Sequence, residues 1–404
     1  MRSRPILADV PRCSSSNAIG RPSRRSLRPY DRARRSDAGV ARVAGNIARE
    51  LGDFAKARER YLAALDAGID LDTWYVLGAL AHTKRYADRD DPDIARFEAH
   101  ARDEKYTPRA RAATGFGLAK AYDDLGDYES AAHTLRDANA RVRSVLPWSA
   151  AAWDAFVEAR MNERVVHVRA STHSDFKPIF VVGLPRTGTT LTATRLAQHI
   201  GARDRGELRI LRFIAERLIT GGHLGDADAI AEAAALYRVH ARQDDAPAPC
   251  YIDQDPMNFR YLHVIEAMFP DARVIWCRRN RRDTALSIWS QDFAHHDAAF
   301  AYDFASIAAV RGRSRSLVGL LACDAVVADS RARLRGARRK SVGGARCIER
   351  LHRCAATIRR SPSTETTPIH SASVWQARQP IYAASVGRWR KYAPFVPELT
   401  ELFA

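Results

Sequence analysis

The stretch GLPRTGTTL, from Gly183 to Leu191, limits the possible folds more than any other part of the sequence. It follows PIFVVG (178–183), a short continuous apolar run of the kind that forms a buried parallel strand, and it precedes a helical pattern. Gly183 and Gly188 have the spacing of the two glycines in a Walker A loop, where backbone N–H groups and a helix N-terminus surround an anion. We therefore expect an anion-binding loop here. The alternative is an ordinary glycine-containing turn between a strand and a helix.

The loop departs from the Walker pattern at the position of the lysine, which Thr189 occupies. A nucleoside triphosphate needs that lysine for its β- and γ-phosphates, and it needs the following hydroxyl for Mg²⁺. The cation here is instead Arg186, inside the loop, and two hydroxyls follow it at Thr189 and Thr190. This combination predicts a smaller anion bound without metal, and it makes a P-loop kinase the least favoured enzyme class.

The segments after the loop alternate between helix and strand patterns. RYLHVIEAMF (260–269) predicts a helix that ends at Pro270, and ARVIWCRR (272–279) predicts a second buried strand. DTALSIWSQ (283–291) then predicts a further helix. Alternation of this kind indicates a parallel sheet with helices on both faces. We therefore predict a three-layer α/β domain of the P-loop type over residues 177–404.

Residues 38–147 have the pattern of paired amphipathic helices. ELGDFAKA and LGDYESAA repeat one spacing of small residues, and their glycines, Gly52 and Gly126, are 74 residues apart. This distance is about two units of the 34-residue tetratricopeptide period. WYVLGALA supplies a unit between them, in which Trp74 fills the gap beside closely packed small residues. We expect an all-α domain of three tetratricopeptide-like repeats, with a generic helical bundle as the alternative, followed by a polar, mostly helical linker (148–176).

The net charge of +17 is concentrated in two segments. Residues 1–37 hold ten Arg against three acidic residues, and residues 311–360 hold fourteen Lys or Arg against three. The rest of the chain is close to neutral, so the folded part is not a basic protein and we expect no nucleic-acid partner. The basic segment 1–37 is predicted to be disordered.

The segment 311–370 is unusual in other respects. It contains no Phe, Trp or Tyr, and RARLRGARRK (331–340) has neither helical nor strand periodicity. One interpretation is a disordered basic linker that binds an acidic partner. The other, which we favour, is a shifted reading frame in an Arg- and Ala-rich coding sequence, because recognisable sequence resumes at Ser371.

Cysteine usage and hydropathy indicate a cytoplasmic protein. The six cysteines include no CxxC pair, which predicts neither a disulfide framework nor a zinc site. No apolar run approaches the roughly 20 residues of a membrane helix, and the N-terminus lacks the apolar core of a secretory signal.

PRTGTTL is similar to the PRSGTTL loop of sulfotransferases, in the branch that includes tyrosylprotein sulfotransferases and bacterial proteins with N-terminal tetratricopeptide repeats. The resemblance covers nearly the whole chain except 1–37 and roughly 311–370. It implies that the chain takes a sulfuryl group from 3′-phosphoadenosine-5′-phosphosulfate as co-substrate, without metal, and gives it to a hydroxyl-bearing acceptor. The residues that the likeness assigns to the 5′-phosphosulfate are Arg186, Thr187, Gly188, Thr189 and Thr190.

Two further motifs carry the resemblance. CRRNRRDTALSIW has Arg279 and Ser287 at the spacing of the family's 3′-phosphate site, which combines a guanidinium for bidentate binding with a hydroxyl. A basic surface turn is the alternative for this motif. GRWRKY (387–392) resembles the family's C-terminal G-x-W-[KR] element, which makes Arg390 a candidate ligand of the nucleotide.

The likeness also proposes catalytic residues. Glu207, in RGELRIL, matches the family's GE element, whose glutamate is the general base; a solvated helix glutamate is the alternative. DQDPMNF (253–259) resembles a Lys-x-Pro segment whose lysine lies near the transferred group, but this chain has Gln254 there. A neutral amide donates a hydrogen bond without offsetting developing charge. Asp255 is a conceivable second base.

These residues predict a sulfotransferase in which Glu207, Arg186 and Gln254 act at the reacting groups. The helical repeats would recruit an acceptor or a protein partner, or mediate oligomerisation. The main alternative is a catalytically impaired sulfotransferase-like protein that serves as a repeat-based scaffold, which Gln254 and the segment 311–370 both favour.

Overall fold

The computed structural model describes residues 38–162, 170, 176–243, 247–293, 296–319, 325–329, 333–336 and 385–403, so the predicted disordered segment 1–37 lies outside it. The described chain divides into two compact units. The first, which we call the sheet unit, contains residues 151–279 and 311–336. The second, the helical unit, contains residues 38–150, 280–310 and 385–403. The sheet unit thus begins before residue 177 and the helical unit includes residues after it, so the two units differ from the two domains predicted on either side of residue 177.

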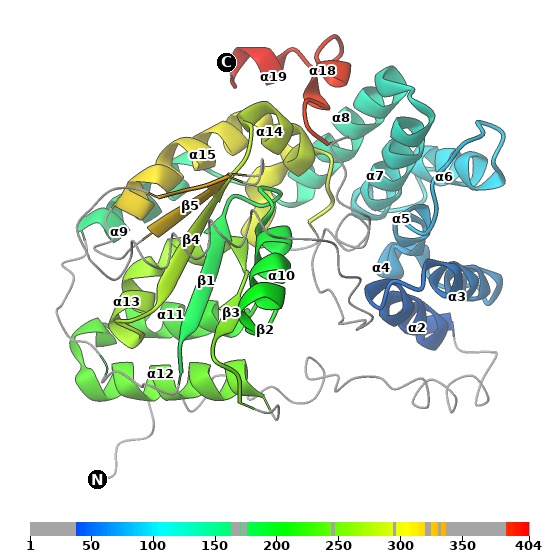
Figure 1. The fold of residues 1–404 in the computed structure, drawn as a ribbon. Helices are drawn as coiled ribbons and strands as arrows, with labels where there is room; N and C mark the ends of the chain where they lie inside the picture. Colours follow the sequence, from blue (N-terminus) through cyan, green and yellow to red (C-terminus); the bar gives the residue numbers. More distant parts are fainter. Residues whose placement is uncertain are drawn as a thin grey trace. The chain divides into compact units, whose positions relative to one another are not determined.

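The sheet unit is built on one six-stranded sheet in the order β2-β3-β1-β4-β5-β6. Neighbouring strands are parallel except for β5 and β6, which are antiparallel. β1, β4 and β5 lie side by side in Figure 1, where the yellow-green β4 lies between the green β1 and the golden β5. The strands are β1 (Pro178–Gly183), β2 (Arg203–Asp204), β3 (Tyr251–Asp253), β4 (Arg273–Arg278), β5 (Ala325–Asp329) and β6 (Arg333–Gly336). The predicted parallel α/β architecture is confirmed.

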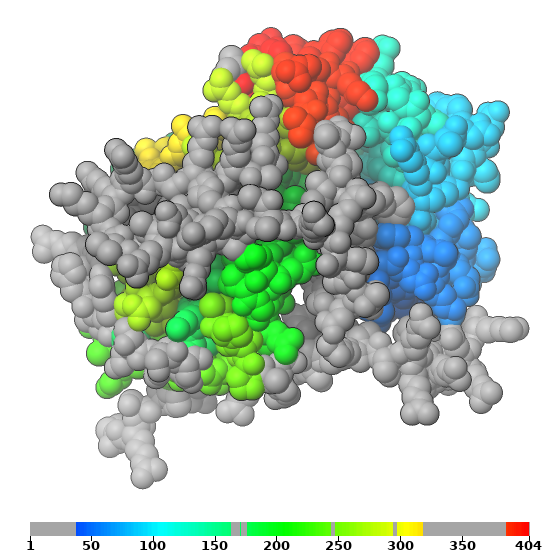
Figure 2. Space-filling view, in the orientation of Figure 1, coloured from blue at the N-terminus to red at the C-terminus, as the bar shows by residue number. Residues whose placement is uncertain are grey.

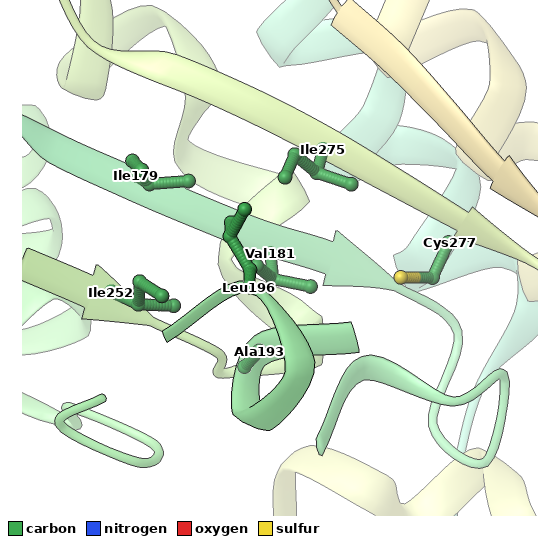
Figure 3. Close-up of a cluster of buried hydrophobic side chains, with 7 residues drawn as sticks. All are labelled: Ile179, Val181, Ala193, Leu196, Ile252, Ile275 and Cys277. Carbon is green, nitrogen blue, oxygen red and sulfur yellow. The ribbon is translucent and has the colours of Figure 1, made fainter. Parts of the chain in front are cut away.

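Every residue of β1 is buried, because helices cover both faces of the sheet at this strand. On one face, Val181 packs with Ile252 and Ile275 of the neighbouring strands under Ala193 and Leu196 of α10 (Thr189–Ile200), as Figure 3 shows. On the other face, the ring of Phe180 lies 5.7 Å from that of Tyr237 in α12 (Ala227–Arg242). Successive side chains of the apolar run 178–183 thus point to opposite faces of the sheet, and a helix covers each face.

The remaining helices of the sheet unit follow the predicted pattern. The helix expected at 260–269 is present as a short 3-10 turn, η2, and the helix α13, which ends two residues before Pro270. The ring of Trp153 lies 6.4 Å from that of Phe259, so the helix inside the predicted linker packs within the sheet unit. These elements are α9 (Ala150–Asn162), α11 (Ile210–Thr220), η1 (His223–Gly225), η2 (Pro256–Tyr261) and α13 (Leu262–Met268).

The helical unit contains two helical hairpins with the same turn. The first joins α2 (Ala38–Glu50) to α3 (Phe54–Asp66), and the second joins α7 (Pro108–Leu125) to α8 (Tyr128–Val145). Each turn has a glycine in the left-handed region, Gly52 with φ 84° and Gly126 with φ 81°. An N-cap aspartate follows each glycine and accepts a backbone N–H three residues on. This shared turn explains the repeated LGD sequence, and the tetratricopeptide assignment itself stays a prediction.

The predicted middle repeat differs from the structure. Tyr75 has φ 47° and divides WYVLGALA into two short helices, α4 (Leu71–Trp74) and α5 (Val76–Ala81). Trp74 is 36% exposed, so the expectation that its ring fills a gap between helices is wrong. The close packing of small residues is present between α5 and α7, where a Cβ on Gly117 would lie 2.7 Å from the Cβ of Ala81.

Residues from the second half of the chain complete the helical unit. The side-chain amide of Asn139 in α8 donates to the carbonyl of Trp289 at the end of α14 (3.0 Å). Arg136, also in α8, pairs with Glu398 at 2.7 Å. Figure 2 shows the same packing at the surface, where the red C-terminal residues border the cyan residues of the N-terminal helices. The additional elements are α6 (Pro92–Arg102), α14 (Arg281–Trp289), η3 (His296–Tyr302), α18 (Trp389–Tyr392) and α19 (Glu398–Glu401).

Part of the segment 311–370 has regular structure. α15 (Phe304–Gly319) continues into it, β5 pairs in parallel with β4, and β6 lies within RARLRGARRK. β6 therefore forms at 333–336 in a stretch whose sequence has no strand periodicity. The two interpretations of the segment, a shifted reading frame and a disordered linker, stay hypotheses because its other residues lie outside the described ranges. Among the helices that the structure describes, none is long and apolar enough to cross a membrane.

Candidate functional site

The loop between β1 and α10 has a backbone that only glycine permits at its first position. Gly183 has φ 155°, and a Cβ there would lie 2.7 Å from the carbonyl oxygen of Cys277 and 2.9 Å from the hydroxyl of Thr187. Gly188 has φ 100° and is the N-cap of α10, without a side-chain cap. The first N–H groups of a helix have no partner inside it, and together with the helix dipole they attract an anion. The backbone at Gly183 and Gly188 is of the kind that the predicted anion-binding loop requires, and the binding of an anion there stays a prediction.

The side chains of Arg279 and Thr187 donate hydrogen bonds to backbone carbonyl groups of the loop. Arg186 has φ 68°, an uncommon value for a residue with a Cβ, and Nη1 of Arg279 donates to its carbonyl oxygen at 3.1 Å. The hydroxyl of Thr187 donates to the carbonyl of Leu184 at 2.7 Å. Its amide donates to the same oxygen at 3.3 Å. Thr187 thus stabilises the loop, and a role as a ligand would require these bonds to be exchanged.

Glu207 lies in the loop between β2 and α11, and its side chain is half-buried. The pKa of its carboxyl is raised to about 8, chiefly by burial and also by the negative charge of Asp255, against the opposing effect of Arg209. The negative charge of Asp253 also raises this pKa, and the positive charge of Arg186 lowers it. The structure therefore places Glu207 within electrostatic range of Arg186 and before the first residue of α11, and its role as a base stays a prediction.

Gln254 follows the last residue of β3, at the edge of the sheet where the parallel strands end. The side chain is 3% exposed, and its backbone N–H donates to the carbonyl of Gly206 at 2.9 Å. Its Oε1 is buried and accepts no hydrogen bond from the part of the chain that the structure describes. Buried polar atoms are nearly always paired, so this oxygen marks a place where a donor is expected.

Asp253 is a member of this site that the sequence analysis missed. Its carboxylate is buried and accepts from four donors: the amides of Leu208 and Asp255 on Oδ1, and the hydroxyl of Tyr237 and side-chain amide of Asn258 on Oδ2. Its pKa is raised to about 7, chiefly by burial and also by the charge of Asp255, against the lowering effect of the hydrogen bonds that the carboxylate accepts. Two of these donors, Asp255 and Asn258, are two and five residues further along the chain, whereas Tyr237 and Leu208 are 16 and 45 residues away, so no local pattern indicates their convergence.

The candidate 3′-phosphate residues are divided between the two units. Arg279 follows β4 in the sheet unit, whereas Ser287 is buried in α14 of the helical unit. Within the helical unit, the carboxylate of Asp283 accepts the backbone N–H groups of Gly387 (2.8 Å) and Trp389 (3.2 Å). One carboxylate thus joins the helix of Ser287 to the turn that carries Arg390. The pairing of Arg279 with Ser287 stays a prediction.

Arg390 is exposed, and its guanidinium carbon lies 5.1 Å from the ring centroid of Trp389. The guanidinium carbon of Arg282 lies 4.5 Å from the same centroid. Two cations beside one aromatic ring form a positively charged surface on the helical unit.

In the described ranges, no three or more His, Cys, Asp or Glu side chains lie together in a group that could hold a metal ion.

Comparison with known proteins places a sulfotransferase family domain at residues 178–331, from β1 to just beyond β5. The match extends past residue 311, so the family resemblance reaches further than the sequence analysis placed it. The chain is also similar to a protein of Aquifex aeolicus (strain VF5) described as uncharacterized. They are 28% identical over 324 residues, which cover 73% of this chain and 41% of that protein. The chain therefore spans about two-fifths of the length of this relative.

The two loop glycines allow the steric and conformational constraints to be separated. We expect Gly183→Ala to lower the free energy of unfolding by at least about 3 kcal/mol, because its Cβ overlaps backbone and the residue keeps a strained φ. Gly188→Ala meets no atom within 4 Å and serves as the control. It should cost only about 1–2 kcal/mol of backbone strain. Urea denaturation of both variants measures the difference, and equal losses would contradict the close packing at Gly183.

Proposed function

We propose that this chain transfers a sulfuryl group from 3′-phosphoadenosine-5′-phosphosulfate to the hydroxyl of an acceptor. The observation that carries the proposal is the anion-binding loop at Gly183–Thr190, in which a left-handed glycine caps a 12-residue helix and a threonine occupies the Walker lysine position. The sulfotransferase family domain at residues 178–331 supports it. The donor set lacks what a nucleoside triphosphate with Mg²⁺ requires.

The residues of the loop fit the sulfated end of such a nucleotide. Arg186 supplies a positive charge, and the first turn of α10 supplies backbone N–H groups and the hydroxyls of Thr189 and Thr190. The absence of a Cβ at Gly183 keeps the loop packed against β4, which holds these donors in a fixed arrangement. In this proposal Arg279 and Ser287 bind the 3′-phosphate, and Arg390 contributes positive charge.

The proposed reaction exchanges one bond at sulfur. The acceptor oxygen forms a bond to sulfur while the bond between sulfur and the 5′-phosphate oxygen breaks, and adenosine 3′,5′-bisphosphate leaves. Glu207 accepts the proton of the acceptor hydroxyl, for which it must be ionised. Arg186 offsets the charge that develops on the leaving oxygen. Gln254 offers an N–H group at the edge of the sheet, where the resembling family has an ammonium.

A scaffold protein with an impaired transferase domain is the second candidate, and one observation favours it. The side chain of Gln254 is buried, and its Oε1 accepts no hydrogen bond from the residues that the structure describes, so this position offers no positive charge to a reacting group. In that case the chain would bind the nucleotide without transferring the group, and the helical unit would recruit a protein partner.

Binding of adenosine 3′,5′-bisphosphate, measured by isothermal titration calorimetry, tests the proposed function. We expect Arg186→Ala to weaken this binding roughly 10- to 100-fold, the value of one charge-assisted hydrogen bond to an anion. Arg273→Ala is the matched control, because this exposed arginine is the first residue of β4, at the end of the strand away from the loop. Equal affinity of the two variants would contradict the assignment of Arg186. No affinity in the folded wild-type protein, or tight binding of ATP with Mg²⁺ instead, would overturn the proposal.

Replacement of Gln254 separates an active enzyme from a scaffold. We expect Gln254→Lys to raise kcat roughly 100-fold, because an ammonium offsets charge in the transition state that an amide leaves unbalanced. Radiolabelled sulfuryl transfer to acceptors in a host extract provides the assay. Gln254→Met, of similar length and without charge, should give no increase. An unchanged or lower rate in the lysine variant, with bisphosphate affinity retained, would refute the assignment of this position.

The raised pKa of Glu207 predicts an alkaline pH dependence. Because a general base works in its ionised form, kcat/KM should fall about tenfold per pH unit below the pKa of about 8 and reach a plateau above it. Glu207→Gln should lose both most of the rate and this ionisation. A wild-type profile that is flat between about pH 6 and 9 would exclude Glu207 as the base.

A further inference from the structure

The buried carboxylate of Asp253 connects two loops that each carry a candidate catalytic residue. Its Oδ1 accepts the amide of Leu208 at 3.2 Å, the residue after Glu207. The same oxygen accepts the amide of Asp255 at 3.0 Å, the residue after Gln254. One oxygen atom therefore sets the separation of the two loops at the point where they present these side chains.

The other oxygen of Asp253 is anchored in the core of the sheet unit. Oδ2 accepts the hydroxyl of Tyr237 in α12 at 2.8 Å and the side-chain amide of Asn258 in η2 at 3.0 Å. Tyr237 itself is buried between Phe176, Phe180 and Phe269. The carboxylate is 2% exposed, so it is fixed from behind by packed aromatic side chains and cannot rotate without breaking several bonds.

A backbone contact reinforces the same connection. The amide of Gln254 donates to the carbonyl of Gly206 at 2.9 Å, and the amide of Arg205 donates to Ile252 at 2.8 Å. These bonds extend the pairing of β2 with β3 beyond the strands, as far as the residue before Glu207. Asp253 then holds the residue after it, so Glu207 is bracketed on both sides by the end of β3.

We propose that Asp253 is a positioning residue that fixes Glu207 relative to Gln254 and the anion-binding loop. The inference rests on the proposed function for the roles of Glu207 and Gln254, whereas the connection itself is independent of any reaction. Asp253 is buried beneath these side chains, so it acts through the two loops that it joins.

The charge of Asp253 gives the positioning role an electrostatic signature. The charged groups that act on Glu207 are Asp255 and Asp253, which raise its pKa, and Arg209 and Arg186, which lower it. Loss of the charge on Asp253 removes one of the two negative charges that raise the pKa of Glu207. A looser loop also hydrates Glu207 and reduces the effect of burial, which is the largest cause of its raised pKa. Both effects move the ionisation of Glu207 to lower pH.

Asp253→Asn tests the proposal, since an amide keeps the shape of the side chain but has one acceptor oxygen, which cannot serve both the backbone amides of Leu208 and Asp255 and the side-chain donors of Tyr237 and Asn258. We expect the ionisation midpoint of Glu207, followed by infrared titration of its carboxyl band and assigned with Glu207→Gln, to fall by about half a pH unit or more. The pH profile of kcat/KM should shift in parallel, with kcat reduced roughly 10-fold or more. Affinity for adenosine 3′,5′-bisphosphate should change less than about 3-fold, because Asp253 lies outside the loop.

Asp226→Asn is the control, because this exposed N-cap of α12 also accepts two backbone amides, those of Asp228 and Ala229. It should leave the Glu207 midpoint unchanged. If Asp253→Asn fails to fold, Tyr237→Phe removes only one donor from Oδ2 and should give a smaller shift in the same direction.

An unchanged midpoint in a folded Asp253 or Tyr237 variant would overturn the proposal. This readout requires no turnover, so it remains decisive even if the wild-type protein fails to bind the bisphosphate and the proposed function is wrong.

Discussion

The close approach of Gly183 to the carbonyl of Cys277 is the constraint on which the rest of the site depends. A strand with a side chain at this point could not turn so sharply against β4, and the loop that follows would not place the first turn of α10 where it lies. The left-handed backbone of Arg186 and its hydrogen bond from Arg279 follow from the same turn. The sheet supplies the rigidity, and the loop converts it into a fixed set of donors.

The site combines a cationic loop with three carboxyl groups at the ends of adjacent strands. Burial makes ionisation of Glu207 and Asp253 costly, and each added negative charge increases that cost. Arg186 is the compensating charge that reaches Glu207 from the loop. The strength of the candidate base is thus set by neighbours on three different segments, and a change at any of them alters its proton affinity.

The sequence predicts the elements with local patterns and misses those that depend on distant contacts. Continuous apolar runs identify β1 and β4, and the glycine spacing identifies the loop, because each pattern reflects contacts within a few residues. Trp74 was misplaced because the left-handed Tyr75 breaks a helix without a glycine or proline to indicate it. Asp253 was missed because its Leu208 partner is 45 residues away and its role exists only once the strands are assembled. β6 lies in a stretch without alternation, where pairing with β5 determines the strand.

The ion pair between Arg136 and Glu398 joins residues 262 positions apart inside the helical unit. Asp123 likewise pairs with Arg388, and Asn139 with the end of α14. During synthesis the N-terminal helices therefore leave the ribosome long before the residues that cover them, and they wait with part of their packing surface exposed to water. Such a chain has a period of vulnerability to aggregation and proteolysis, and a nonsense mutation just before residue 385 would leave α7 and α8 without the residues that pack against them.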